Sequence, residues 1–349
     1  MKQLMIAALL LASVSSAAQD PLTLDELLGE FGWSFESAEI RTQKVGKGLY
    51  VLFGLGGNIA VSIGEQGVLV VDDQFPEMIP KVNAAIREIG GGEIDFAINT
   101  HWHFDHAEGN LVLGPAGSWI ISQSNSRDMM QGTHLINLVA MSYEQQRYPA
   151  DALPVITYDD RMQIHFNGEQ IDLLHFGPAH TTGDTAVIFR GHNAVHFGDV
   201  FNNTGYPFVD ADNGGDIDGM IAFCSGVLDE LTPDSVVIPG HGEISDYQGL
   251  ADYIDMLKTA RSRIAKHMEE GSSIDAILAA NPLADLDERY GDSAQFIDRV
   301  YASLARKCSG RRGPGTLAEC RARTCISMPL IAPADRQSHP VVRPAGPIP

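Results

Sequence analysis

The side chains with the clearest chemical potential are crowded into residues 100–110, which read THWHFDHAEGN. This stretch places His101, His103, Asp105 and His106 within one short turn. Imidazole nitrogens and carboxylate oxygens are common protein ligands of zinc and related divalent cations. The chain has 12 histidines in 349 residues, so their concentration here is a specific signal for a metal site.

A catalytic zinc needs three protein ligands and an open coordination position, and a single mobile turn binds metal weakly. Further ligands should therefore come from elsewhere in the chain. Three candidates stand at the ends of apolar strands, each with glycine close by: His180 in FGPAHTTGD, Asp199 in HFGDVFNN and His241 in VVIPGHGE. Because glycine lets the backbone approach a metal closely, we expect these three side chains to converge on the 100–110 stretch.

The apolar pattern predicts two groups of strands with helices between them. The first group comprises residues 48–54, 58–63, 67–73, 95–100 and 118–123, with a helix over 76–90. The second comprises residues 162–168, 170–176, 185–190, 193–199 and 235–240, with helices over 218–231 and 250–270. Residues 124–150 are expected to be helix and loop. Two strand-rich halves, each closed by helices, predict two sheets packed face to face with helices outside.

Composition limits the class of protein. A hydrophobic content of 44% supplies a real core, and a formal net charge of -21 argues against nucleic acid as a partner. Residues 1–18 combine Lys2, the apolar run LMIAALLLA and small residues at 16–18, which is typical of a signal peptide. We therefore expect a periplasmic or secreted protein, and the later sequence predicts no membrane span in the mature chain.

The C-terminal part of the chain changes character. Residues 306–349 carry eight basic and two acidic side chains and are rich in Pro and Gly, whereas 19–305 should form the folded domain. A disordered extension is the favoured interpretation, with an out-of-frame translation or a basic docking arm as alternatives. Three of the four cysteines lie in this tail, and the fourth, Cys224, is expected to be a buried thiol in a helix.

The H-x-H-x-D-H motif, the separated His180, Asp199 and His241, and Asp72 in GVLVVDD together resemble the metallo-β-lactamase superfamily. The resemblance implies an α/β fold, a four-layer αββα sandwich with a dinuclear metal site at one edge. Carried over by position, it assigns His101, His103 and His180 to a first zinc and Asp105, His106 and His241 to a second, with Asp199 as the bridge.

The donor set supports hydrolytic chemistry. Nitrogen and oxygen donors without a thiolate suit two Zn²⁺ ions, with iron and manganese as open alternatives. Two adjacent divalent cations lower the pKa of a shared water to about 7, so a metal-bound hydroxide exists at neutral pH and can attack a carbonyl carbon. Asp105 is the expected catalytic residue, because it can bind metal and orient this nucleophile. No separate serine or cysteine nucleophile is needed.

Position 199 bears on the substrate, which should be a small molecule. Lactamases of the family's thiolate-using group have a cysteine there, and another lactamase group has a serine. Asp199 is instead similar to the aspartate of glyoxalase II-type thioesterases and lactonases. We expect cleavage of a cyclic amide or ester or a related carbonyl bond, in a β-lactamase-like or lactonase-like reaction, with a thioesterase as the alternative. Phosphodiesterases and sulfatases also stay open, although few cationic clamps for phosphate appear near the motifs. Loop 201–215 should border the pocket through Asn203, Tyr206 and Phe208.

Two functions from other classes stay open. The first is a diiron redox protein, although such members of the family usually have a glutamate where His103 stands and this sequence has no flavin-binding segment. The second is a zinc-binding protein without turnover.

Supporting roles are expected for three further residues, Asp72, Thr181 and Asp184, the last two fixing His180 by hydrogen bonds. The remaining strand histidines, His165, His175, His192 and His196, should be packing or surface residues.

Overall fold

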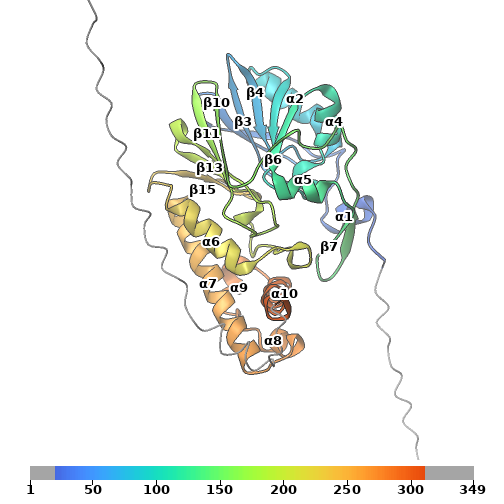
Figure 1. Cartoon of the computed structure of the whole chain (residues 1–349), viewed down its shortest axis with the longest axis vertical. Helices are drawn as coiled ribbons and strands as arrows, with labels where there is room; N and C mark the ends of the chain where they lie inside the picture. Colours follow the sequence, from blue (N-terminus) through green and yellow to red (C-terminus); the bar gives the residue numbers. More distant parts are fainter. Residues whose placement is uncertain (1–19, 311–349) are drawn as a thin grey trace, which may run out of the picture. The chain divides into compact units, whose positions relative to one another are not determined.

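Strands with alternating apolar side chains build two sheets at the centre of the computed structural model, which describes residues 20–310 (Figure 1). The first sheet has seven strands in the order β1-β2-β3-β4-β5-β6-β9. Their bounds are β1 Arg41–Gly46, β2 Leu49–Phe53, β3 Ile59–Gly64, β4 Gly67–Val71, β5 Ile94–Ile98, β6 Trp119–Gln123 and β9 Ile156–Tyr158. Strands β1 to β4 pair antiparallel, whereas β4, β5, β6 and β9 pair parallel.

The second sheet has six strands in sequential order. They are β10 Arg161–Phe166, β11 Glu169–Leu174, β12 Ala186–Phe189, β13 Ala194–His196, β14 Val236–Ile238 and β15 Ser245–Asp246. Only the β13–β14 pair is parallel among these neighbours. Strands β11, β13 and β14 therefore run in one direction, and their carboxyl ends lie at the same edge of the sheet.

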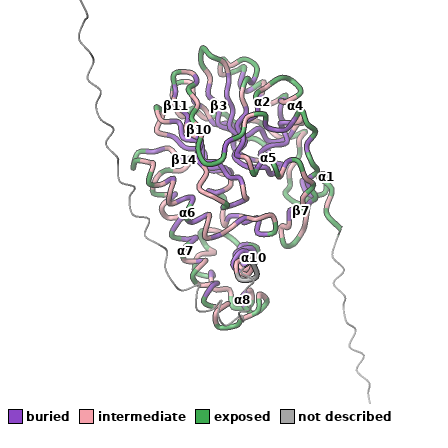
Figure 2. The backbone as a smooth tube through the Cα atoms, viewed as in Figure 1, coloured by how far each residue is buried: buried purple, intermediate pink, exposed green. Residues whose placement is uncertain are grey.

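The period of two along each strand divides its side chains between two apolar layers. In β4, Leu69 and Val71 pack in a cluster shared by the two sheets, while Val68 and Val70 face the helices outside the first sheet. Figure 2 shows the central strands as largely buried backbone. The predicted face-to-face packing of two sheets is confirmed.

Helices cover the outer face of each sheet. The first sheet packs against α1 Leu24–Glu30, α2 Ile79–Glu88, α4 Asn110–Ala116 and α5 Ser124–Met130. The second packs against α6 Ile217–Leu228, α7 Tyr247–Glu269, α8 Ile274–Ala280 and α10 Ala294–Gly310, with the short α9 Asp287–Tyr290 beside them. The result is the four-layer αββα sandwich. No helix within residues 20–310 has the length and apolar character needed to cross a bilayer.

Two sequence-based expectations need correction. Within residues 124–150 the helix ends at Met130, and a hairpin follows, β7 His134–Asn137 and β8 Ser142–Gln145. The mostly apolar residues 135–141 run from β7 through the turn and so do not mark two separate strands. The second correction concerns the boundary after Ala305, which falls inside α10; the next two side chains, Arg306 and Lys307, bond to residues 211–218. The predicted signal peptide and residues 311–349 of the predicted tail lie outside the described residues.

Candidate metal centre

Every predicted ligand follows the carboxyl end of a strand. His101, His103, Asp105 and His106 come after β5, the last two from the one-turn helix α3, Phe104–Ala107. His180 follows β11, Asp199 follows β13 and His241 follows β14. In open α/β sheets, loops at the carboxyl ends of parallel strands are where ligand sites form. The structure brings all seven side chains into one cluster at this edge.

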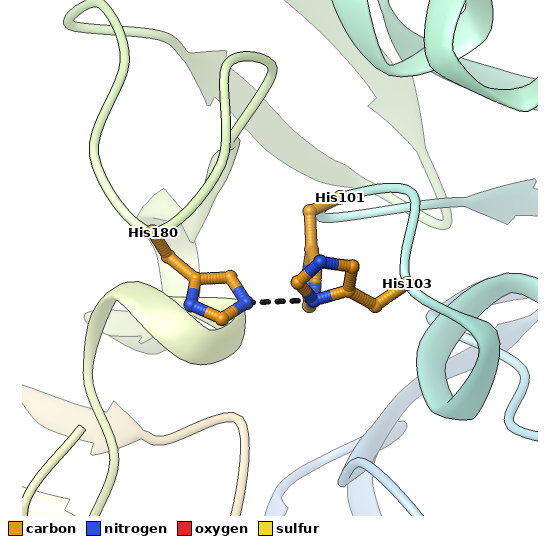
Figure 3. Close-up of side chains that lie close together, drawn as sticks. All are labelled: His101, His103 and His180. Atoms are coloured by element: carbon orange, nitrogen blue, oxygen red, sulfur yellow. Dashed lines mark hydrogen bonds between the residues drawn. The ribbon is translucent and has the colours of Figure 1, made fainter. Parts of the chain in front are cut away.

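The first half of the cluster, which we call the three-histidine site, consists of His101, His103 and His180 (Figure 3). One nitrogen from each ring lies within 4.8 Å of the others. Nε2 of His180 is 2.9 Å from Nδ1 of His103. The rings come from two segments more than 70 residues apart, and all three are almost completely buried.

The second half consists of Asp105, His106 and His241, again with their ligand atoms within 4.8 Å of one another. Nε2 of His241 lies 3.2 Å from Oδ2 of Asp105 and 3.2 Å from Nε2 of His106. Asp199 lies between the halves: its Oδ1 is 3.4 Å from Nε2 of His241, and its Oδ2 is 3.9 Å from Nε2 of His180. A carboxylate in this place suits the predicted bridging role.

Each of four imidazoles has one nitrogen occupied by an acceptor outside the cluster. Nδ1 of His101 faces Oγ1 of Thr100, Nε2 of His103 faces Asp210, Nδ1 of His106 faces Asp72, and Nδ1 of His180 faces the Phe208 carbonyl. These acceptors lie 2.7 to 3.0 Å away. When the outer nitrogen of a neutral imidazole donates, the inner nitrogen carries a lone pair.

The inner nitrogens therefore fit a cation better than they fit one another. In the tautomers set by Asp210 and Phe208, two lone pairs of His103 and His180 face each other at 2.9 Å, which is repulsive without a positive charge between them. Nε2 of His101 is buried and has no hydrogen-bond partner at all. A buried polar atom without a partner is costly, and a metal ion would satisfy it. The donor set thus fits two divalent cations.

The charges within the cluster are strongly coupled. Burial, together with the neighbouring His106, holds the pKa of His101 well below its usual range, so this ring is a neutral ligand. Burial also lowers the pKa of His180. Burial alone would lower the pKa of His241, but the carboxylates of Asp199 and Asp105 raise it to about 10. A cation entering the second half must therefore displace a proton from His241.

The structure corrects the role predicted for two residues beside His180. Asp184 accepts from the backbone N–H groups of Ala179 and Thr181 and from the Thr181 hydroxyl, so the pair shapes the loop. The ring of His180 is held by the Phe208 carbonyl instead. Asp72 does have the predicted supporting role, because its carboxylate accepts from Thr100 and contacts His106.

Sequence reasoning missed Asp210 as a partner of His103. The two residues are 107 positions apart, and an aspartate in a loop rich in Asp and Asn looks like an ordinary solvated side chain. In the structure Asp210 is completely buried, which distinguishes it from a solvated aspartate. Burial raises the pKa of Asp210, but hydrogen bonding to His103 and Asn213 outweighs this and lowers it.

Two glycines allow the cluster to close. A Cβ at Gly57 would overlap the imidazole ring of His106, and a Cβ at Gly240 would overlap the carboxylate of Asp199. Only a residue without a side chain permits this approach of backbone to ligand.

The loop predicted to border the pocket lies beside the cluster. Phe208 packs against the rings of His103 and His180, with centroids 6.1 and 5.8 Å apart. The backbone N–H of Asn203 donates to the His241 carbonyl, and Tyr206 stacks on Phe296 of α10.

Two adjoining cavities of about 260 and 350 Å³ open along this loop, the first lined in part by Phe208 and the second by Asn203. Their only cationic lining residue among those described is Arg289.

The other strand histidines lie outside the cluster. His165, His175 and His192 bond to nearby side chains or backbone, and His196 holds the Asn58 carbonyl against β13. Cys224 is buried in α6, as predicted.

Comparisons with known proteins agree with this geometry. The sequence profile of the metallo-beta-lactamase superfamily matches residues 57–261, more than half of the chain. A protein of Methanocaldococcus jannaschii named as a probable metallo-hydrolase is 23% identical over 201 residues, covering 56% of this chain and 91% of that protein.

Solved structures share the fold. The DIM-1 metallo-beta-lactamase gives a TM-score of 0.50 at 18% identity, covering 64% of this chain and 98% of that one. A metallo-beta-lactamase from Pontibacter korlensis gives 0.51 at 13% identity, covering 63% and 99%. With the profile match and the seven converging side chains, the chain belongs to the metallo-beta-lactamase superfamily.

Proposed function

We propose that the protein is a metal-dependent hydrolase that holds two zinc ions and cleaves a cyclic ester, a cyclic amide or a related activated carbonyl bond. One observation carries the proposal. Seven nitrogen and oxygen donors from four strand ends point at one another, and the nitrogens of four rings are oriented by acceptors on their outer side. Such outer partners are typical of functional metal sites.

The three-histidine site would hold one zinc, and Asp105, His106 and His241 the other, with Asp199 between them. When bound, the two ions would supply an activated water and a Lewis acid for the carbonyl oxygen. The chain itself contributes a general base candidate, the carboxylate of Asp105, which is near the open side of the site. The side chains of Asp105 and His241 keep 12% and 19% of their surface exposed, whereas His106 has none. Substrate should approach from that side.

The surroundings favour an uncharged substrate over a phosphate or sulfate ester. Arginine and lysine clamps are the usual means of holding such anions. The two cavities along loop 201–215, which none of the candidate ligands lines, contain one arginine, Arg289, and two carboxylates, Asp246 and Asp292. The whole chain is also strongly acidic, which disfavours anions at long range. An uncharged lactone or thioester suits this scarcity of cationic side chains better.

The experiment is a substrate panel run on protein of measured zinc content. A homoserine lactone, a chromogenic cephalosporin, a thioester and a phosphodiester are each assayed with and without chelator. We expect turnover of at least one carbonyl substrate, its loss on chelation and its return with zinc. Full activity after complete metal removal would contradict the mechanism, and turnover of the phosphodiester alone would contradict the substrate class.

A matched pair of variants distinguishes loss of a candidate metal ligand from loss of a histidine elsewhere in the fold. His241→Ala should abolish turnover, because it removes a ligand, whereas His165→Ala on the surface of β10 should leave turnover unchanged.

We also propose that the protein is exported, and this proposal rests on the sequence of residues 1–18 alone. The N-terminal sequence of protein recovered from outside the cytoplasm would test it.

A further inference from the structure

Segment 208–216 determines how two of the candidate ligands point. The Phe208 carbonyl accepts from Nδ1 of His180 at 2.7 Å, and the buried Asp210 carboxylate holds Nε2 of His103 at 3.0 Å. The backbone of Asp210 also donates to the His180 carbonyl. A shift of this segment would therefore rotate two of the three rings of the three-histidine site.

One face of α10 holds this segment from outside. Arg299, Ser303, Arg306 and Lys307 recur at the spacing of a single helix face, and each contacts the segment or the start of α6. Ser303 Oγ accepts from the first backbone N–H of α6, and Lys307 Nζ lies 2.7 Å from Asp216. All four residues lie beyond the part of the chain that the family profile matches.

Arg306 makes the most direct connection. Its guanidinium donates to the carbonyl oxygens of Ala211, Gly214 and Gly215 at 2.7, 3.1 and 2.8 Å. The Ala211 carbonyl also accepts from the backbone N–H of Gly214 at 3.4 Å, at the end of a short 3-10 helix. One planar cation with several donors can fix the relative positions of such carbonyls. Charge-assisted hydrogen bonds of this kind are among the stronger ones.

Arg299 adds a second anchor. The residue is 6% exposed, and its Nη1 donates to Oδ2 of Asp212 at 2.7 Å. The same oxygen accepts from Asn137 of the β7–β8 hairpin at 2.8 Å. The segment is thus held between the hairpin and α10, two residues away from the aspartate that holds His103.

We propose that α10 is a positioning element of the three-histidine site: through Arg299 and Arg306 it fixes segment 208–216 and thereby the ring orientations of His103 and His180. The inference rests on the proposed function, because it takes these rings to bind a metal. It assigns to the C-terminal helix a part in metal binding, in addition to its part in the apolar core.

The test measures zinc affinity of each half of the centre separately, in the full chain. His241→Ala removes a ligand of the second half and leaves the three-histidine site, whereas His180→Ala does the reverse. Arg306→Met is introduced into both backgrounds, and metal-free protein is titrated with zinc against a chromophoric chelator. Loss of a partner that orients a ligand typically weakens metal binding by about 10-fold. We expect that loss in the His241→Ala background and a change below about 2-fold in the other.

Arg263→Met is the matched control. This arginine of α7 also bonds to a carboxylate and a carbonyl, those of Asp285 and Pro282, but it does not touch segment 208–216. It should leave zinc affinity unchanged in both backgrounds. Arg306→Lys, which keeps the charge with fewer fixed donors, should recover part of the affinity. If Arg306→Met does not fold, as judged by circular dichroism, Arg299→Met carries the same comparison, because its partner Asp212 is half-exposed.

Unchanged zinc affinity of the folded arginine variants in the His241→Ala background would overturn this inference and leave the proposed function standing. Equal losses in both backgrounds would overturn it too, since they would show a general structural effect. Absence of zinc binding by the unaltered chain would instead overturn the proposed function, and the inference with it.

Discussion

Oδ1 of Asp199 lies 3.1 Å from Nε2 of His106, at the point where the two halves of the candidate metal centre meet. The same oxygen lies 3.4 Å from Nε2 of His241, and it has no partner in hydrogen-bonding geometry. Burial would raise the pKa of Asp199, but the charges of His241 and His106 hold it well below its usual range. The residue is therefore an anion that both halves can share.

Replacing this anion tests the bridging role. Asp199→Asn keeps the size of the side chain but removes its charge, so we expect zinc content to fall from two per chain toward one. Turnover should fall on the order of 100-fold, because the carboxylate ligand shared by the two halves is lost. Elemental analysis after dialysis and kcat/KM measure the two effects. Asp255→Asn on the exposed side of α7 is the control, and two tightly held zinc ions in Asp199→Asn would contradict the bridge.

Metal removal should lower stability as well as activity. An ion that binds only the folded chain stabilises it by about 2.7 kcal/mol when its concentration is 100 times Kd. For a domain of this size that corresponds to a Tm shift of about 5 °C. Thermal unfolding with chelator, and with chelator already saturated by zinc, measures the shift. Identical Tm values in the two conditions would show that the cluster holds no zinc.

Asp72 should act through His106 and the loop that carries the motif. Its carboxylate accepts from the backbone N–H and the hydroxyl of Thr100 at 2.7 and 2.8 Å and lies 2.7 Å from Nδ1 of His106. Asp72 has a φ of 65°, which asparagine also tolerates, so Asp72→Asn tests the charge without straining the backbone.

We expect zinc affinity of Asp72→Asn to fall about 10-fold, measured by chelator competition. Asp72→Ala should bind more weakly still, because it adds backbone strain and removes every acceptor. If Asp72→Asn keeps the zinc affinity of the unaltered chain, the charge of Asp72 does not act on metal binding through His106.

The candidate ligands were readable from sequence because each is a local pattern, a His or Asp directly after an apolar strand. Parallel strands put those ends at one edge, so convergence followed from strand direction. Asp210 carried no such mark, since its role depends on a contact with His103 across 107 positions. Burial of a loop aspartate is a property of the folded chain.

The domain boundary predicted after Ala305 lies inside α10 for a similar reason. The change in composition after Ala305 begins before α10 ends, so it places Arg306 in the tail although this residue donates to three backbone carbonyls of the folded domain. The elements predicted from the sequence do not include α10, although the apolar spacing of Phe296, Val300 and Leu304, which are all buried, is a signal that could have marked it. In the β7–β8 hairpin the mostly apolar residues 135–141 run through the turn, so their pattern does not show where the strands lie.

Close packing at Gly57 gives a prediction about shape rather than charge. A Cβ at this position would overlap the His106 ring, so Gly57→Ala should displace that ligand and reduce turnover by about 100-fold or more. Gly92→Ala is the matched control, because a Cβ there meets nothing within 4 Å. Zinc content and kcat/KM of both variants measure the effect. Equal activities of Gly57→Ala and Gly92→Ala would show that the backbone at Gly57 can shift without displacing the His106 ligand.

Acid should weaken the attachment of α10 through Asp218 of α6. Its carboxylate accepts from Arg261 Nε at 2.7 Å and from Lys307 Nζ at 2.9 Å. Burial raises the pKa of Asp218, but the hydrogen bonds and charges of Arg261 and Lys307 outweigh it and leave the pKa below its usual value. A folded-state pKa below the unfolded value means that the carboxylate stabilises the fold above about pH 4. That contribution is lost as the pH falls through the lower, folded-state pKa.

Asp218→Asn should therefore lower the free energy of unfolding at pH 7 by about 1 kcal/mol or less, because the half-exposed ion pairs are screened by solvent. At pH values below the folded-state pKa the variant and the unaltered chain should have the same stability, since a protonated aspartate resembles asparagine in charge. Urea unfolding of the metal-free proteins at pH 7 and near pH 2.5 measures both differences. Asp255→Asn should show neither difference, and a loss in Asp218→Asn that persists undiminished in acid would rule out the ion pairs as its cause.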